Sequence, residues 1–141
     1  MYQTIILIGN LGKDPEKRFT PGGHPVTTMS VATNRRYRDS SGQVVKETTW
    51  FRVTVWGKQA EPCFNNLRKG SKVFVEGRLT PDPKTGGPFL WKKDGQIHAS
   101  YEVTASTVRF LSGRDAHGWN DTTSEEANES THNPEIEDIE F

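Results

Sequence analysis

The stretch of sequence that decides the fold is residues 48–56, which read TTWFRVTVW. Its β-branched and aromatic residues favour an extended strand, whose side chains alternate between two sides. One side then carries Phe51, Val53 and Val55. The other side carries Trp50, Arg52, Thr54 and Trp56. The first set predicts a core, whereas rings flanking a guanidinium make a poor core and a good platform for stacked bases. The alternative is that the tryptophans lie in a second core or in a subunit interface.

Four further β-rich runs accompany this strand. They cover residues 2–8, 25–33, 72–79 and 100–110. Turn-forming residues such as Gly, Pro, Asn and Asp separate the runs. Gly77 interrupts the third of them and predicts a bulge, because a glycine inside a strand weakens the regular ladder.

One short helix is predicted after the central strand. Four residues follow the spacing of a single helical face: Ala60, Cys63, Phe64 and Leu67. Gly70 then predicts the end of this helix. Five strands with one helix between the third and the fourth predict a mostly all-β domain, the five-stranded Greek-key barrel called the OB-fold.

The formal net charge of zero is the sum of two opposed blocks. All 18 Lys and Arg residues and half of the 18 acids fall within residues 1–114, so this block is strongly basic. Residues 115–141 hold the other acids and no Lys or Arg. Between residues 115 and 135 there is no Val, Ile, Leu, Met or Phe, so little apolar surface can offset the ordering entropy. We therefore predict an OB-fold domain at residues 1–111 and a disordered linker at residues 112–134.

The last seven residues, 135–141, read EIEDIEF and bring apolar side chains back among acids. This pattern predicts a short partner-binding tip, with Asp138, Ile139 and Phe141 as its contact residues. The alternative is an acidic tail that only aids solubility.

Several kinds of chemistry are not supported by the sequence. The single cysteine, Cys63, excludes a disulfide within the chain and a CxxC zinc site, and the histidines lack metal-ligand spacing. Residues 9–13, GNLGK, have the wrong glycine spacing for a phosphate loop and predict a turn at the end of a strand. The N-terminus has no basic leader and no long apolar run. We therefore expect a cytoplasmic protein with no catalytic residues, no metal and no cofactor.

Four segments resemble the bacterial single-stranded-DNA-binding protein family over nearly the whole chain. They are residues 8–16, 31–33, 50–53 and 67–77, and the terminal Ile139-Glu140-Phe141 matches as well. The resemblance implies an OB-fold that assembles as a homotetramer and binds single-stranded DNA without strong sequence preference. It also implies recruitment of replication, recombination and repair proteins by the tip, on DNA of the nucleoid. The tip differs from common family tails in having Glu140, and not proline, before the final Phe.

The resemblance also identifies candidate site residues. Tyr37 lies in the basic run NRRYR at 34–38, and Trp91 lies in the basic run FLWKK at 89–93. Each run predicts a hairpin arm that binds nucleic acid. The alternative for each is a solvated charged hairpin. The candidate stacking residues are Tyr37, Trp50, Trp56, Phe89 and Trp91. The candidate phosphate contacts are Arg18, Arg35, Arg38, Arg52, Lys58, Lys69, Lys92 and Lys93.

The sequence is also compatible with other functions. One is an OB-fold that binds RNA, and another is an accessory protein of replication restart. An enzyme, such as a nuclease or a helicase subunit, is disfavoured by the missing catalytic motifs.

Overall fold

The structure, a computed structural model, describes residues 1–112. Except for Ser112, the predicted linker and partner-binding tip lie outside these described residues, together with Asp138, Ile139 and Phe141. The elements in chain order are β1 (Ile5–Leu11), β2 (Glu16–Phe19), β3 (Pro25–Arg38), β4 (Val44–Trp56), the 3-10 turn η1 (Gly57–Gln59), α1 (Ala60–Asn66), β5 (Lys72–Leu79), β6 (Phe89–Lys93) and β7 (Gln96–Phe110).

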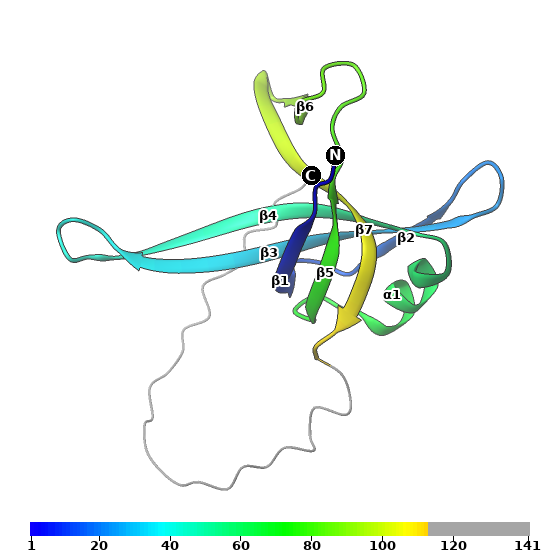
Figure 1. The fold of residues 1–141 in the computed structure, drawn as a ribbon, viewed down its shortest axis with the longest axis horizontal. Coiled ribbons are helices and arrows are strands. Elements are labelled where there is room, and N and C mark those ends of the chain that lie inside the picture. Colours follow the sequence, from blue (N-terminus) through cyan, green and yellow to red (C-terminus); the bar gives the residue numbers. More distant parts are fainter. Residues whose placement is uncertain (113–141) are drawn as a thin grey trace, which may run out of the picture.

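The strands form a closed barrel (Figure 1). The circuit runs β1-β5-β7-β4-β3 and returns to β1, because β1 pairs with both β5 and β3. The pairing of β4 with β7 is parallel and the other pairings are antiparallel. Helix α1 connects β4 to β5. The OB-fold prediction is therefore confirmed, with β2 and β6 as additional short strands that pair with β3 and β7.

The core confirms the predicted alternation along β4. Val53 and Val55 are fully buried, and Phe51 packs against the same apolar cluster. Met29 and Val31 on β3 and Val103 on β7 join them. Helix α1 adds a polar tie, since the buried Thr27 hydroxyl donates to the carbonyl oxygen of Ala60 at 2.6 Å.

Strand β1 differs from its prediction at both ends. It begins at Ile5 and continues to Leu11, so the turn predicted at residues 9–13 is wrong for residues 9–11 and is confined to the bend at Gly12 and Lys13. The physical reason is the closure of the barrel. An added Cβ on Gly9 would lie 2.2 Å from the carbonyl oxygen of Ala32, so β1 can pass over β3 only where it has no side chain. Gly9 therefore lies inside strand β1, where its lack of a side chain allows the close approach to β3.

Two other glycines have separate roles. The predicted bulge is confirmed, because the register of β5 against β7 shifts between Glu76 and Gly77. The predicted helix end at Gly70 is wrong: α1 ends at Asn66, where the chain returns to extended geometry at Leu67. Gly70 instead has φ of +87° and donates its N–H to the carbonyl oxygen of Leu11, which turns the chain into β5.

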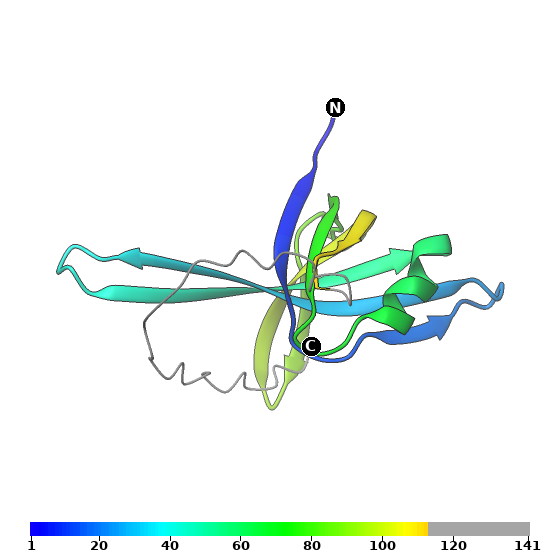
Figure 2. The ribbon, with the colours of Figure 1, turned by 90° about the horizontal axis from the view of Figure 1, so that it is seen from below.

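Among the hairpins that project from the barrel, two contain the predicted basic runs (Figures 1 and 2). The longer arm consists of the ends of β3 and β4, and the other consists of β6 and the start of β7. The tip of the longer arm is ordered by Asp39, whose Oδ1 accepts hydrogen bonds from the Ser41 hydroxyl and from the backbone N–H groups of Ser41 and Gln43. These bonds, the Ser41 hydroxyl first, hold the pKa of Asp39 below its usual value. The longer arm is therefore regular structure with a defined turn.

We predict that Gly9→Ala destabilises the barrel. The added methyl group would meet backbone atoms of β3, which cannot move aside as a flexible side chain can. Overpacking of this kind costs about 1–3 kcal/mol, so the free energy of unfolding in urea should fall by that amount. Gly87→Ala is the matched control, since its Cβ would meet only the Thr85 hydroxyl oxygen at 3.6 Å. Equal stability of the two variants would contradict the proposed close approach.

Candidate nucleic-acid interface

The side of β4 that is turned away from the core carries the predicted platform. We call this side the outer face: Trp50, Arg52, Thr54 and Trp56 on β4, with the residues level with them on β3 and β7. The side chain of Trp56 is 50% exposed, and that of Trp50 is half-buried. Both rings therefore lie at the surface of the single chain, outside the core cluster.

Small residues on β3 make room for the large ones on β4. The register pairs Val26 with Trp56, and Ala32 with Trp50. Val26 is fully buried and Ala32 is 7% exposed, although neither belongs to the core cluster. Because residues directly opposite each other share a side of the ladder, each ring lies beside a smaller neighbour that it shields from water. The smaller side chains of Val26 and Ala32 on β3 thus leave room for the rings of Trp56 and Trp50 on β4.

The ring of Trp50 rests on the backbone of Gly12. A Cβ placed on Gly12 would lie 2.4 Å from Cζ3 and 2.5 Å from Cη2 of Trp50. The N–H of Gly12 donates to the carbonyl oxygen of Ser30 at 3.0 Å, which fixes this backbone against β3. The backbone of Gly12 therefore supports the ring of Trp50, a contact that the sequence prediction did not identify.

The arm formed by β6 and β7 extends the outer face. Its register places Trp91 opposite His98, and their rings are stacked with centroids 4.4 Å apart and planes 19° apart. Phe89 lies opposite the buried Ser100, on the same side of the arm as Trp91. The alternation of β7 carries this side into the outer face at Glu102, which is level with Arg52. The register thus places four of the five candidate stacking residues on the same side of the sheet: Trp50, Trp56, Phe89 and Trp91.

Tyr37 occupies the other side of its arm. The ladder of β3 and β4 is continuous, and it pairs Tyr37 with Val45 and Arg35 with Glu47, out of phase with Trp50. The guanidinium of Arg35 lies 5.0 Å from the centroid of the Tyr37 ring, and Tyr37 is 39% exposed. Tyr37 and Arg35 therefore form a separate exposed aromatic–cation pair.

The candidate phosphate contacts fall into different places. Arg18 is opposite Val26, on the side of Trp56, and Lys93 is on the side of Trp91. Lys92 lies on the opposite side of the same arm from Lys93.

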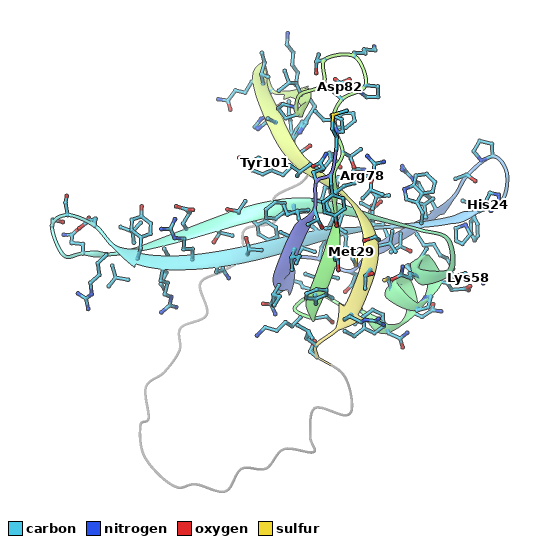
Figure 3. The ribbon with its side chains drawn as sticks, in the orientation of Figure 1. His24, Met29, Lys58, Arg78, Asp82 and Tyr101 are labelled. Carbon is cyan, nitrogen blue, oxygen red and sulfur yellow. The ribbon has the colours of Figure 1, made fainter. Side chains whose placement is uncertain are left out.

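Arg38 lies on the outer side of the long arm, where its Nη1 donates to the carbonyl oxygen of Gly42 at 3.2 Å. Lys58 lies beside α1, at the end of the barrel away from that arm (Figure 3). The backbone N–H of Lys69 donates to Asp14 Oδ1 at 2.8 Å, which ties the loop before β5 to the segment after Gly12. Arg38, on the long arm, and Lys58, beside α1, therefore lie at different ends of the structure.

The sequence prediction did not name Arg36, Lys46 and Arg78, which lie on the outer side of the sheet. Arg36 and Lys46 face each other across the long arm, in phase with Trp50, and Arg78 on β5 is level with Thr104 on β7. All three are exposed. Extending the alternation from residues 48–56 back to residue 46 would have found Lys46, whereas Arg36 and Arg78 required the strand register.

Other chemistry has little support in the described part of the chain. Burial raises the pKa of the Cys63 thiol to about 11, so it is protonated at neutral pH. Among residues 1–112, no group of three or more His, Cys, Asp and Glu side chains is arranged to hold a metal ion. No helix within the same residues has the length and apolarity needed to cross a membrane.

Known proteins resemble this chain over the barrel and its arms. The model of the single-strand binding protein family matches residues 2–111. A single-stranded DNA-binding protein of Neisseria meningitidis is 39% identical over 110 residues, which are 78% of this chain and 60% of that protein. The corresponding protein of Xylella fastidiosa is also 39% identical, over 78% of this chain and 63% of its own length. The chain thus spans about 60% of the length of these curated relatives.

Solved structures give the same result. A deletion mutant of the single-stranded DNA binding protein from Thermus aquaticus matches with a TM-score of 0.61 and 35% identity, over 79% of this chain and 51% of that one. The Plasmodium falciparum SSB in complex with ssDNA matches with a TM-score of 0.64 and 26% identity, over 79% of this chain and 96% of that one.

We predict that Gly12→Ala displaces the ring of Trp50 toward water. Its fluorescence emission should shift to longer wavelength, and the free energy of unfolding should fall by about 1–3 kcal/mol because the site is overpacked. Subtracting the spectrum of Trp50→Phe isolates the emission of Trp50. In the Trp50→Phe background, Gly12→Ala should leave the remaining emission unchanged. An unshifted Trp50 spectrum in Gly12→Ala would show that Gly12 does not support the Trp50 ring.

Proposed function

Because the chain belongs to the single-strand binding protein family, we propose that it binds single-stranded DNA without strong sequence preference and catalyses no reaction. The observation that carries this proposal is the shared side of Trp50, Trp56, Trp91 and Phe89 across β4 and the β6–β7 arm. Every base has a π-face, so a row of rings stacks bases of any sequence. In OB-fold proteins of this family such stacking is worth about 1–3 kcal/mol per base.

The basic residues around the rings supply contacts to the DNA backbone. Arg18, Arg36 and Lys93 border the outer face at three different strands. Phosphate contacts carry no sequence information, and the release of counterions makes them sensitive to salt. Aromatic stacking inside a basic border is therefore the combination that a non-specific single-strand binder needs.

We infer further that the protein acts as a homotetramer. Ile6 and Ile8 on β1 are 58% and 57% exposed, an unusual exposure for neighbouring large apolar side chains on one strand. Among residues 1–112, β1 pairs with β3 at Asn10 and Leu11, which leaves the edge of its earlier residues open. An open edge with apolar side chains favours contact with a second copy of the chain.

The tail extends the proposed function to protein partners. We infer that the tip, through Asp138, Ile139 and Phe141, recruits proteins of DNA replication, recombination and repair. The support is the return of apolar residues among acids in a tip that follows a polar linker. A cytoplasmic, nucleoid-associated location follows from this proposal.

We predict that poly-dT quenches the tryptophan fluorescence of the full chain strongly and that mixed-sequence single strands do so with similar affinity. The physical reason is the stacking of bases on Trp50, Trp56 and Trp91. Trp56→Ala should weaken binding about tenfold, and raising the salt concentration should weaken binding of all strands alike.

Fluorescence titration measures the affinities, and light scattering on the same samples gives the mass with and without oligo-dT. Duplex DNA of equal length is the control and should quench little. Absence of quenching by poly-dT on the tetramer would refute DNA binding. Tighter binding of an RNA strand of the same sequence would favour the RNA-binding alternative.

We predict that removing residues 115–141 tightens DNA binding at low salt. This segment contains half of the acids of the chain and no Lys or Arg, so it competes with phosphate for the basic border of the barrel. The gain should fade near 1 M salt, where charges are screened beyond about 3 Å.

A full-length variant with amides in place of the tail acids separates charge from length. It should bind like the truncated chain when salt titrations of the two are compared. Equal affinity of the truncated and intact proteins at low salt would argue against competition by the tail.

A further inference from the structure

One ion pair lies inside the outer face. Arg52 Nη1 is 3.5 Å from Glu102 Oε1, and the side chains are 40% and 13% exposed, respectively. The same carboxylate oxygen accepts a hydrogen bond from the Ser100 hydroxyl at 3.0 Å, and Ser100 is 6% exposed. Glu102 is thus anchored by its own strand while it faces the guanidinium. The charge that the sequence assigned to phosphate binding is already compensated within the protein.

The strand register places this pair at the centre of the stacking surface. Arg52 lies between Trp50 and Trp56 along β4, with Glu102 level with it on β7. On the other flank, β3 presents Ser30, which is small and buried. Bases stacked on the two tryptophans would therefore lie above or beside Arg52, while the more distant Arg18 and Arg36 border this row.

We propose that Glu102 is a positioning residue that holds Arg52 as a contact for bases, and that Arg52 does not serve as a phosphate contact. This inference rests on the proposed binding of single-stranded DNA.

The carboxylate of Glu102 disfavours a second anion beside Arg52. A phosphate that approached the guanidinium would come close to the carboxylate of Glu102, whose low exposure weakens screening by water. Repulsion between the two anions would offset much of the attraction by Arg52. A base is neutral and meets no such repulsion.

The guanidinium of Arg52 keeps hydrogen-bond donors that a base can use. A guanidinium is planar and carries five N–H donors, and the ion pair with Glu102 is made through one of its atoms, Nη1. All four bases carry acceptor atoms on their edges, so donors fixed in one plane can contact any base. Such contacts add affinity without demanding a particular sequence.

The closing experiment compares Arg52 with Arg18, which is exposed on the border of the outer face. We expect Arg52→Gln to weaken binding of oligo-dT about tenfold, with an unchanged slope of log K against log salt. Arg18→Gln should weaken binding and reduce the magnitude of the slope by about 0.7, as for one lost phosphate contact on a single strand. Anisotropy of an end-labelled oligonucleotide measures both quantities.

An abasic oligonucleotide of the same length separates base contacts from backbone contacts. The loss in Arg52→Gln should disappear on the abasic strand, whereas the loss in Arg18→Gln should remain. Arg52→Lys keeps the charge and removes the planar group, so it should lose affinity for oligo-dT as Arg52→Gln does. Glu102→Gln should increase the magnitude of the salt slope by about 0.7, because it releases the charge of Arg52 to phosphate.

The outcomes separate this inference from the function on which it rests. A reduced slope for Arg52→Gln, an undiminished loss on the abasic strand, or full affinity of Arg52→Lys would overturn the role of Arg52 while leaving DNA binding intact. A wild-type protein that binds no oligo-dT would overturn both. Circular dichroism of each variant verifies the fold, and Arg52→Lys carries the test if Glu102→Gln does not fold.

Discussion

The approach of Gly9 on β1 to the carbonyl oxygen of Ala32 on β3 closes the barrel, and every other part of the structure depends on that closure. With an added Cβ only 2.2 Å from that oxygen, any side chain would hold the two strands apart. Closure gives β4 one side that faces a filled core and another that faces outward. Trp50 and Trp56 lie on the outward side of β4 for this reason.

The outer face is built by matching large residues with small ones. Ala32 lies opposite Trp50, and the backbone of Gly12 supports the same ring. Farther along the ladder, Val26 lies opposite Trp56. A ring that is supported from below loses little freedom when a base stacks above it, and preorganisation of this kind favours binding. Under the proposed function, Ala32, Gly12 and Val26 would support the rings without contacting a base themselves.

The sequence predicted the parts of the fold that depend on local periodicity. The alternation from Trp50 to Trp56, the helix around Cys63 and the bulge at Gly77 are all confirmed. The parts that depend on register could not be predicted. The pairing of Arg52 with Glu102 joins residues fifty positions apart across a parallel ladder. The position of Tyr37 out of phase with Trp50 likewise follows only from the continuous register of β3 and β4.

The parallel pairing of β4 with β7 also governs the order in which the chain can fold. Strand β7 is the last strand in the chain and bonds to β4, β5 and β6, so the barrel cannot close before β7 has been synthesised. During synthesis, the hairpin of β3 and β4 can form early because its contacts are local in the sequence. The core around Val53 stays open until Val103 on β7 has emerged from the ribosome. The nascent chain therefore displays its apolar core until translation of the barrel is nearly complete.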